Sequence, residues 1–383
     1  MLSPPLRVTF IIRRFVYGGA ERQLVELLKH LDRTRIAPSV ICLYPGGGLW
    51  DELAAIDGLE VLHLGKSGRW DFTALLRIVA HLRRLRPNVV HGYMDVANLI
   101  ALAGKALGAK VVWGVRASRV DLQRYDWVHR LAARVEIGLS RAADLAICNS
   151  EAGKADALSR GMRAGAVVVI PNGIDTARFH RDEAARGAVR QEWGLSPSEL
   201  LVGLPARLDP MKGHAVFVAA AALVGERFRH AKFVCIGDGP AQVRGELQAL
   251  VGSHGLADRF VWAGERPDMP RVLAALDVAV SASLFGEGFS NALGEAMACG
   301  VPCVATQVGD SARVLGGTGW LVPPEDAPAL ATALCSALQA VAAGTVDGTA
   351  LRSHIESNFS VRMLAQRTEH ALQALVAGRV EVR

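Results

Sequence analysis

The sequence predicts an α/β protein made of two Rossmann-like domains, each a parallel sheet covered by helices. Strand-like and helix-like segments alternate through the first half of the chain, and this alternation is typical of parallel strands joined by crossover helices. A turn signature, Pro171-Asn-Gly-Ile-Asp175, then interrupts the pattern. The alternation begins again after it, and 383 residues suit two or three domains.

The elements of the first half follow from apolar periodicity and from the residues that bound each segment. The apolar run at 8–12 is cut short by Arg13-Arg14, so it indicates a first buried strand rather than a signal peptide. We expect strands at 6–12, 38–44, 59–64, 88–92, 110–114, 145–149 and 166–170, and helices at 21–31, 72–85, 97–107 and 127–141.

The second half repeats the same pattern. We expect strands at 199–204, 232–236, 260–263, 278–282 and 303–306, and helices at 214–228, 242–252, 269–275, 328–342 and 350–378. One more helix is expected to begin near Ser290-Asn291, because Ser and Asn cap helix starts. Ligands of parallel sheets bind beyond the carboxyl ends of the strands, so two facing sheets predict a cleft between the domains.

Composition narrows the class of protein. Hydrophobic residues make up 51% and charged residues 21%, which permits large cores and argues against disorder. No run approaches the roughly 18 apolar residues that span a bilayer. The six cysteines form no C-x2-C pair and most lie in apolar segments. We therefore expect buried free thiols in a reducing cytoplasm, without zinc or disulfides.

The net charge of +6 is unevenly spread. Residues 1–180 carry 25 basic and 16 acidic side chains, a balance of +9, and the remainder carries 18 and 21, a balance of −3. A basic first half suggests an anionic membrane surface, a phosphate-bearing acceptor or a nucleic acid as partner. The absence of a nucleic-acid motif and the 6% aromatic content disfavour the last. A basic surface that only keeps the protein in solution is the alternative.

Glu287 and Glu295 form the most informative motif, in Phe285-Gly-Glu-Gly-Phe-Ser-Asn-Ala-Leu-Gly-Glu-Ala-Met-Ala-Cys-Gly-Val-Pro302. The first acid lies in a glycine-flanked loop and the second about one turn into a helix. A helix N-terminus suits a phosphate, and a carboxylate on either side of it can accept hydrogen bonds from sugar hydroxyls. This is the chemistry of a nucleotide-sugar site. Two solvated acids on a helix are the alternative, which the glycine-rich loop disfavours.

This stretch resembles the Glu-x7-Glu signature of retaining glycosyltransferases of family 4, which have the GT-B fold. The Gly-Phe-Ser core, the Glu-Ala-Met-Ala-Cys-Gly-x-Pro tail and the strand at 303–306 carry the resemblance, which covers most of the chain. It implies an acceptor-side Rossmann-like domain at 1–180, a nucleotide-sugar-binding domain at 181–355, and a C-terminal helix at 356–383 that returns to the first domain.

Arg207 and Lys212 follow the first strand of the second domain, in Leu204-Pro-Ala-Arg-Leu-Asp-Pro-Met-Lys-Gly213. An Arg fork and a Lys point charge together can compensate a diphosphate leaving group. The spacing resembles the family's Arg-x4-Lys pair. A solvated loop is the alternative.

Gly18 and Gly19 follow the first strand and open the first helix, in Gly-Gly-Ala-Glu-Arg22. Small residues let the backbone approach an anion. The motif is not G-x-G-x-x-G, so a nicotinamide enzyme is disfavoured. It resembles a family element that contacts the donor phosphate and the acceptor. A tight strand–helix turn is the alternative.

Four further polar residues of the first and second domains stand at or just after predicted strand ends. His91 and Asp95 occupy a region where many relatives carry His-x-His, but Tyr93 stands at the third position here, so the polar catalytic contact is open between His91 and Asp95. Arg116 follows the strand at 110–114 and is expected on the acceptor side. Asp238 resembles a donor-binding turn, with a plain Asp turn as the alternative.

The resemblance implies a retaining transfer in which the leaving phosphate helps to deprotonate the incoming hydroxyl, without a protein nucleophile. Glu287 would hold donor-sugar hydroxyls and Glu295 the ribose. Backbone N–H groups would fix the sugar and phosphate, namely those of Gly288, Phe289 and Ser290. No Asp-x-Asp follows a strand, so we expect no metal and no cofactor besides the donor. The expected catalytic residues are Glu287, Arg207, Lys212, His91 and Asp95.

The function predicted from the sequence is therefore transfer of a sugar from a nucleotide sugar to a sugar- or lipid-linked acceptor, in cell-surface polysaccharide or glycolipid synthesis. The expected location is the cytoplasm, at the inner face of the membrane. The alternatives are a GT-B nucleotide-sugar epimerase, a pyridoxal-dependent phosphorylase and a non-enzymatic nucleotide-sugar sensor.

Overall fold

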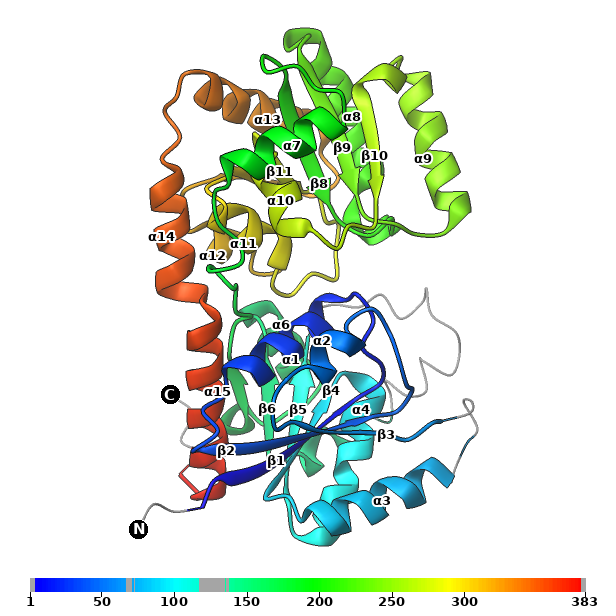
Figure 1. Ribbon diagram of the computed structural model, residues 1–383, viewed down its shortest axis with the longest axis vertical. Helices are drawn as coiled ribbons and strands as arrows, with labels where there is room; N and C mark the ends of the chain where they lie inside the picture. The colour runs from blue at the N-terminus through cyan, green and yellow to red at the C-terminus, as the bar shows by residue number, and fades with distance from the viewer. Residues whose placement is uncertain (1–3, 67–70, 72, 117–134, 136–137, 380–383) are drawn as a thin grey trace. The chain divides into compact units, whose positions relative to one another are not determined.

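The computed structural model describes residues 4–66, 71, 73–116, 135 and 138–379, which form two compact units (Figure 1). Unit 1 consists of Met1–Gly173 together with Val361–Arg383, and unit 2 of Ile174–Ser360. The chain therefore passes from one unit to the other twice.

Unit 1 is built on a parallel sheet. In the part of the chain that the structure describes, the sheet has seven strands in the order β3-β2-β1-β4-β5-β6-β7, and each neighbouring pair is parallel. The strands are β1 (Leu6–Ile12), β2 (Ile36–Cys42), β3 (Glu60–His63), β4 (Val89–Tyr93), β5 (Lys110–Val115), β6 (Leu145–Cys148) and β7 (Val167–Val169). The helices are α1 (Gly19–His30), α2 (Trp50–Ala54), α3 (Thr73–Leu85), α4 (Asp95–Ala101), α6 (Glu151–Ser159) and α15 (Val361–Val376).

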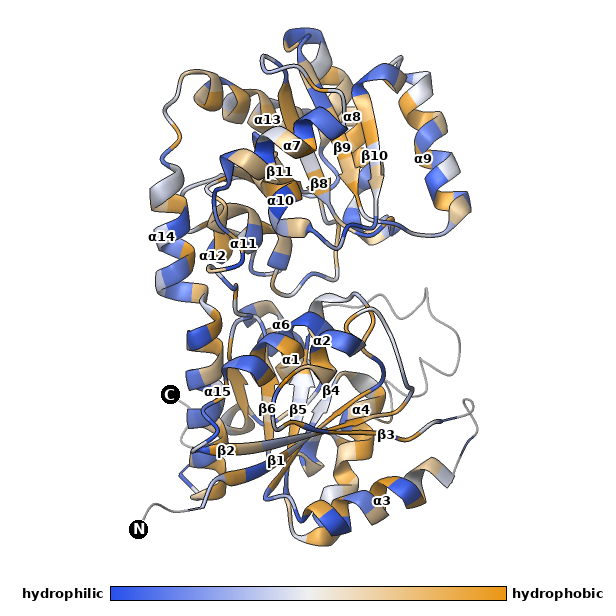
Figure 2. Cartoon of the chain, in the orientation of Figure 1, coloured by the Kyte–Doolittle hydropathy of each residue, from blue (hydrophilic) through white to orange (hydrophobic). Residues whose placement is uncertain are grey.

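Strand β1 shows why this sheet lies in the middle of unit 1. Phe10 and Ile12 enter one buried apolar cluster, which includes Leu364 and Leu372 of α15. Ile11 points to the opposite face and enters a second cluster. Apolar residues therefore cover both faces, as a parallel sheet with helices on either side requires. Figure 2 shows α3 and α15 with both apolar and polar stretches, as expected for covering helices.

Unit 2 repeats this architecture. Its sheet has six strands among the described residues, in the order β10-β9-β8-β11-β12-β13, with parallel neighbours. The strands are β8 (Leu200–Pro205), β9 (Ala231–Ile236), β10 (Phe260–Gly264), β11 (Val278–Ser281), β12 (Cys303–Thr306) and β13 (Trp320–Val322). The helices are α7 (Glu183–Glu192), α8 (His214–Arg227), α9 (Ala241–Ser253), α10 (Met269–Ala274), α11 (Asn291–Ala298), α12 (Ser311–Leu315), α13 (Ala327–Ala342) and α14 (Gly348–Phe359).

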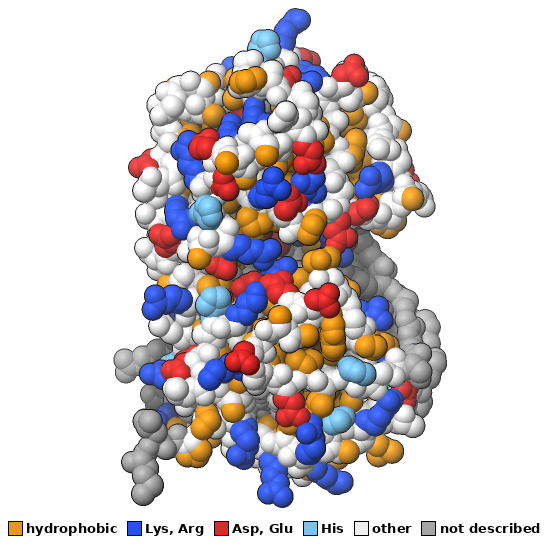
Figure 3. Space-filling model, viewed as in Figure 1, with side chains coloured by type: hydrophobic (Ala, Val, Ile, Leu, Met, Phe, Trp, Pro, Cys, Tyr) orange, Lys and Arg blue, Asp and Glu red, His pale blue; other side chains and the backbone are white. Residues whose placement is uncertain are grey.

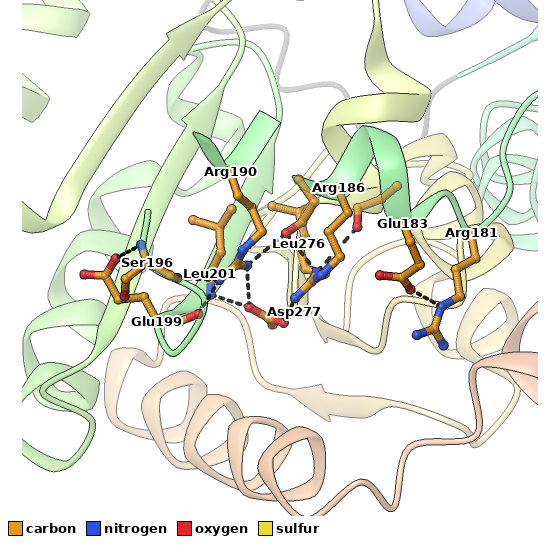
Figure 4. A network of polar contacts seen from close by, with 11 residues as sticks. Arg181, Glu183, Arg186, Arg190, Ser196, Glu199, Leu201, Leu276 and Asp277 are labelled. Atoms are coloured by element: carbon orange, nitrogen blue, oxygen red, sulfur yellow. Dashed lines mark hydrogen bonds and ion pairs between the residues drawn. The ribbon is translucent and has the colours of Figure 1, made fainter. Parts of the chain in front are cut away.

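A buried ion-pair network fastens α7 to the amino edge of the unit 2 sheet (Figure 4). The Asp277 carboxylate, directly before β11, accepts hydrogen bonds from Arg186 at 2.5 Å and from Arg190 at 3.0 Å. It also accepts the N–H of Leu201 in β8, at 2.6 Å. One carboxylate thus joins a helix and two strands, on the edge opposite the carboxyl ends where ligands of such sheets bind.

The structure confirms the predicted α/β class with two Rossmann-like parallel sheets, and β1 and β12 have their predicted limits. The helical segment expected at 350–378 is wrong as a single helix, because Ser360 is extended, with ψ of 152°, and bridges to Ile174. The chain there forms α14 and α15. The helix expected at 127–141 lies mostly outside the described residues. Helices α2, α6, α7 and α12 and strand β13 were not predicted.

All six cysteines are buried and none is in a disulfide. Burial raises the pKa of the Cys42 thiol to about 11 and that of Cys148 to about 12, so both are protonated near neutral pH. Across the described residues, no helix has the length and apolar character needed to cross a bilayer. No group of three or more His, Cys, Asp or Glu side chains in the same residues is arranged to hold a metal ion.

Candidate active site

The loop that follows β8 carries Lys212 and is held by a capping hydrogen bond and by close packing. The Asp209 carboxylate accepts the N–H of Met211 over 3.0 Å and so caps the short turn that contains Lys212. Gly213 ends the turn with φ of 68°. A Cβ atom at Gly213 would lie 2.0 Å from the carbonyl oxygen of Ala282, so the close approach of the two loops requires glycine.

Lys212 and Glu287 are in direct contact. The ammonium of Lys212 lies 2.5 Å from the Glu287 carboxylate, and the Ser283 hydroxyl donates to the same carboxylate oxygen over 2.9 Å. The N–H of Leu284 donates to the carbonyl of Met211 over 2.8 Å, which joins the two loops through the backbone. The two charged side chains are 20% and 12% exposed, so their attraction is stronger than that of a pair on open surface.

A neighbouring loop supports the backbone of Glu287 and Gly288. Gly309, with φ of 59°, packs so closely that a Cβ atom there would lie 2.4 Å from the carbonyl oxygen of Glu287. The N–H of Asp310 donates to the carbonyl of Gly288 over 2.9 Å. Gly286 before them has φ of 75°, a conformation that favours glycine. These contacts fix the position of the Glu287 side chain.

Helix α11 begins at the predicted place and follows this loop. Its N-cap is Ser290, which is buried, extended and without a side-chain capping bond. Phe289 is also buried, and its ring centroid lies 5.3 Å from that of Phe359. The Phe289 side chain therefore anchors the loop, and only its backbone can serve a ligand. Glu295 lies about one turn into α11 and is partly buried.

Arg207 and Asp238 extend from the loops after the adjacent strands β8 and β9. The Arg207 side chain is 68% exposed and lies 3.7 Å from Asp209. The Asp238 carboxylate accepts the N–H of Gly239 over 2.7 Å and a hydrogen bond from Arg244 over 2.7 Å. These two contacts, the Gly239 bond first, lower the pKa of Asp238 below its usual value. The Asp238 carboxylate is thus engaged by its own turn.

In unit 1, Gly18 and Gly19 start α1 at the carboxyl end of β1. Gly18 is the N-cap, and a Cβ atom there would lie 2.2 Å from a carboxylate oxygen of Glu21. The Gln23 side chain makes two hydrogen bonds to the backbone of Gly173, donating over 2.8 Å and accepting over 2.7 Å. Helix α1 therefore holds the segment where the chain leaves unit 1.

His91, Tyr93 and Arg116 lie together at the carboxyl ends of β4 and β5. His91 is fully buried, and neither ring nitrogen has a hydrogen-bond partner among the described residues. Its ring centroid lies 4.9 Å from that of Tyr93, and the Arg116 guanidinium lies 4.4 Å above the Tyr93 ring. Burial, and secondarily Arg116, holds the pKa of His91 well below its usual value, so its imidazole is neutral.

Asp95 is the first residue of α4, but its side chain lies outside the described part of the structure. The structure thus brings Lys212 together with Glu287 in unit 2, and His91 with Arg116 through the Tyr93 ring in unit 1. Ser283 was not predicted from the sequence, and neither was the position of the Tyr93 ring between two polar groups. Both residues lie at a strand end, and this position could have indicated them.

Two family models match the chain. The model described as Glycosyltransferase Family 4 matches residues 17–178, and the model described as Glycosyl transferases group 1 matches residues 199–340. A 2-deoxystreptamine N-acetyl-D-glucosaminyltransferase of Streptomyces fradiae is 33% identical over 287 residues, which is 70% of this chain and 67% of that protein. The chain belongs to glycosyltransferase family 4. It is a glycosyltransferase, as the Glu287 to Glu295 motif predicted.

Two further proteins resemble this glycosyltransferase along nearly its whole length. One is a GDP-mannose-dependent alpha-(1-6)-phosphatidylinositol monomannoside mannosyltransferase of Mycolicibacterium smegmatis, 26% identical over 386 residues and covering 96% of each chain. The other is HepE of Anabaena, solved in complex with UDP and glucose, with a TM-score of 0.84 and 21% identity. That alignment covers 96% of this chain and 100% of HepE, and it shows the GT-B fold.

Proposed function

We propose that this glycosyltransferase moves a sugar from a nucleotide diphosphate sugar to an acceptor hydroxyl, with retention at the anomeric carbon. The observation that carries the proposal is the contact of Lys212 with Glu287 beside the N-terminus of α11, all on the carboxyl edge of the unit 2 sheet. It combines a cation and helix N–H groups, which suit a diphosphate, with a fixed carboxylate, which suits sugar hydroxyls.

In this proposal, Lys212 stabilises the charge that develops on the leaving diphosphate, and Arg207 assists from the exposed side of the same loop. This is an electrostatic mode of catalysis, which depends on groups held in position before the reaction. The Ser283 hydroxyl and the backbone contacts around Gly288 supply that positioning.

The donor would lie along this edge. Glu287 accepts hydrogen bonds from the transferred sugar, and Glu295 accepts them from the ribose. The backbone N–H groups of Gly288, Phe289 and Ser290 bind the phosphate and the sugar, and Asp238 lines the far side of the donor site. In unit 1, the N–H groups of Gly18 and Gly19 at the start of α1 are proposed to contact a phosphate. The complex of HepE with UDP and glucose supports a uridine nucleotide as one donor to test.

The acceptor would bind on the carboxyl edge of the unit 1 sheet. Arg116 offers a guanidinium there, and His91 offers a neutral imidazole held against the Tyr93 ring. A neutral imidazole can accept or donate a hydrogen bond to a hydroxyl. His91, whose ring is fully buried, and Asp95 both stay candidates for the polar catalytic contact. Substitution of each by Ala, with the rate measured at saturating donor, distinguishes them.

Charge compensation by side chains makes a metal ion unnecessary in this proposal, because Lys212, Arg207 and the α11 N-terminus supply the positive charge. We expect transfer in excess EDTA to match transfer in excess Mg²⁺ within about twofold, since these groups need no metal to act. A rate that falls tenfold with EDTA and recovers with Mg²⁺ would contradict metal independence. No cofactor besides the donor is proposed.

A thermal-shift screen of UDP- and GDP-sugars tests the donor assignment. A ligand that binds only the folded protein at 100 times its Kd stabilises it by about 2.7 kcal/mol. At least one nucleotide sugar should raise Tm in the wild type and not in Glu287→Ala. Glu246→Ala is the control, since Glu246 is exposed on α9 and accepts a hydrogen bond from Gln242 of the same helix. If no nucleotide sugar shifts Tm, the proposal is wrong. Release of free sugar without acceptor would indicate the epimerase reaction.

We further propose that the acceptor is sugar- or lipid-linked and belongs to a surface polysaccharide or glycolipid, and that the enzyme works at the cytoplasmic face of the membrane. The name of the mycobacterial relative, a phosphatidylinositol monomannoside mannosyltransferase, supports a lipid-linked acceptor. The balance of +9 over residues 1–180 supports an anionic surface. Sedimentation with phosphatidylglycerol vesicles at low and high salt tests binding to an anionic membrane. The absence of salt-sensitive binding would refute this proposal.

A further inference from the structure

The Lys212–Glu287 pair differs from the exposed ion pairs of unit 2. Figure 3 shows basic and acidic side chains side by side on the surface of unit 2. Exposed pairs of this kind contribute little, because holding two long side chains in one geometry costs conformational entropy. Lys212 and Glu287 are only 20% and 12% exposed. The contacts that surround Glu287 therefore decide where its carboxylate lies.

Thr306, the last residue of β12, holds the loop that carries Glu287. Its hydroxyl lies 2.6 Å from the carbonyl oxygen of Ser283 and 3.3 Å from that of Ser281. A hydroxyl donates one hydrogen, so the shorter contact is the main hydrogen bond. Thr306 is 1% exposed and Ser283 is 3% exposed. The Thr306 side chain is thus a buried link between the end of β12 and the loop that follows β11.

Ser283 extends this link to Glu287. Its carbonyl accepts the Thr306 hydroxyl, and its own hydroxyl donates to the Glu287 carboxylate over 2.9 Å. The same carboxylate oxygen, Oε2, accepts a hydrogen bond from the Lys212 ammonium at 2.5 Å. One chain of hydrogen bonds therefore runs from the buried end of β12, through Ser283, to the charged pair.

The segment that follows β12 also holds the loop on the other side of Glu287. The N–H of Asp310 donates to the carbonyl of Gly288 over 2.9 Å. Two contacts from the same segment thus bracket Glu287, one at Ser283 and one at Gly288. Because the backbone is held on both sides, the Ser283 hydroxyl acts on a carboxylate whose position is already restricted.

We propose that Thr306 is a positioning residue of the active site, which acts through Ser283 to set the direction of the Glu287 carboxylate and so supports binding of the donor sugar. The inference rests on the proposed function for the part that Glu287 plays, and it deepens that function by naming what orients this carboxylate. A threonine that only satisfies a buried carbonyl is the structural alternative. The two differ in which part of the donor is affected when the hydroxyl is lost.

Sugar binding should depend on Thr306 more strongly than phosphate binding does. Hydrogen bonds weaken steeply as their angle closes, so a carboxylate that accepts them from sugar hydroxyls must point in a narrow range of directions. The phosphates are assigned to backbone N–H groups and to Lys212, whose ammonium stands on a flexible stem and can adjust. Loss of the Thr306 hydroxyl should therefore affect the nucleotide sugar and spare the nucleoside diphosphate.

The test compares Thr306→Val, which removes the hydroxyl, with Thr306→Ser, which keeps it. Calorimetry measures binding of the nucleotide sugar that raises Tm most in the screen of UDP- and GDP-sugars, and binding of the matching nucleoside diphosphate. We expect Thr306→Val to weaken the nucleotide sugar about tenfold and the nucleoside diphosphate less than about threefold, because hydrogen bonds to a charged group are the ones disturbed. Thr306→Ser should restore most of the lost affinity. Equal losses for both molecules would indicate the structural alternative and overturn the inference.

Thr318→Val is the matched control for this comparison. The Thr318 hydroxyl also donates to a backbone carbonyl over 2.6 Å, that of Leu315, but Thr318 lies before β13 rather than at the end of a strand. It should leave both affinities within about twofold of the wild type, since substitutions away from a site have small effects. A control that loses as much nucleotide-sugar affinity as Thr306→Val would also overturn the inference.

A second measurement does not depend on any ligand. The free energies of unfolding of the wild type, Thr306→Val, Glu287→Ala and the double variant form a double-mutant cycle. We expect the double variant to lose less than the sum of the single changes, because both act on one chain of hydrogen bonds. The cycle of Thr306→Val with Lys232→Ala should be additive, since Lys232 lies in β9 and pairs with Glu199.

The two ideas can therefore fail separately. An additive cycle of Thr306 with Glu287 overturns the inference and leaves the proposed function standing. A wild-type protein that binds no nucleotide sugar overturns the proposed function, and the cycle alone then decides whether Thr306 acts on Glu287.

Discussion

The carboxyl edges of the two sheets handle charge in different ways. On the unit 2 edge, cations meet carboxylates: Lys212 contacts Glu287, and Arg244 contacts Asp238. On the unit 1 edge, cations meet rings: Arg116 lies over Tyr93, and Tyr44 lies among three cations. A ring attracts an exposed cation by about 0.5–1 kcal/mol and leaves its charge in place. The named cations of the first edge thus lie against carboxylates, and those of the second lie against aromatic rings.

The same architecture thus supports two electrostatic environments. Parallel strands and strand–helix loops set where side chains gather, and the loop sequences set which charges gather there. In unit 2 the acid needed beside Lys212 comes from a loop 75 positions further along the chain. In unit 1, Arg13, Arg14 and Lys66 come from separate loops and lie around the Tyr44 ring. The predictions below test this difference, beginning with the largest expected effect.

The largest effect is expected from breaking the unit 2 pair. Lys212→Ala or Glu287→Ala should lower kcat/KM about a thousandfold, as loss of one preorganised charge-stabilising group does elsewhere. The assay uses the nucleotide sugar found in the thermal screen. Lys232→Ala is the matched control, because Lys232 pairs with Glu199 at 3.5 Å near the start of β9. Wild-type turnover in the first two variants would remove the basis for the unit 2 site.

The next effect concerns the amino edge of the same sheet. Asp277→Ala should lower the free energy of unfolding by about 3 to 5 kcal/mol, because it leaves the buried Arg190 without its carboxylate. Urea unfolding measures this. Asp326→Ala, which removes the cap of α13, should cost only about 1 kcal/mol. A similar loss in both would show that the network in Figure 4 contributes no more than a helix cap.

The two sheet edges share one feature, because each has a buried, neutral histidine. We therefore expect the free energy of unfolding to depend on pH. Burial holds the pKa of His91 well below 6.5 and lowers that of His214 to about 4. The unfolded chain then binds protons that the folded protein does not, so stability is full above about pH 6.5 and falls as pH drops. For His214 the loss between pH 6.5 and 4 is about 3 kcal/mol. Urea unfolding at each pH should show a flatter dependence in His214→Gln; an unchanged slope would contradict this.

The smallest effect is expected at Glu295. Glu295→Ala should weaken donor binding about tenfold, since charged hydrogen bonds contribute roughly 1.5–3 kcal/mol in proteins, and leave kcat within about threefold. Calorimetry with the nucleotide sugar gives the affinity, and saturation kinetics give kcat. Unchanged affinity would exclude Glu295 from the ribose. A loss of kcat as large as that of Lys212→Ala would move Glu295 into the reacting part of the site.

Much of the fold could be predicted from the sequence because its signals are local. The apolar run of β1 and the Ser-Asn start of α11 each depend on a few neighbouring residues. Helix α7 has an amphipathic pattern and an Asp182 cap, but it follows directly on a turn-rich segment and was not recognised. The break at Ser360 could not be predicted, because it depends on the bridge to Ile174, far away in the sequence.

In the candidate site, too, local features could be predicted from the sequence and contacts between distant segments could not. Spacing and residue type singled out Lys212 and Glu287, and the structure shows them in contact. Spacing could not reveal that Tyr93, which looked like a departure from a polar motif, lies between His91 and Arg116. Nor could it reveal that Arg13, Arg14 and Lys66 lie around the Tyr44 ring, since these residues come from separate loops. Contacts between distant segments are set by the sheet order, which local patterns do not encode.

Helix α15 belongs to unit 1 but follows unit 2 in the chain, and this order affects how unit 1 folds during synthesis. This helix is synthesised after all of unit 2, yet Leu364 and Leu372 complete the cluster that covers Phe10 on β1. On the ribosome, unit 2 can fold while one face of the first-made sheet is still open. An early stop codon that removes α15 would leave that face uncovered and aggregation-prone, although the helix contributes no residue to the chemistry proposed above.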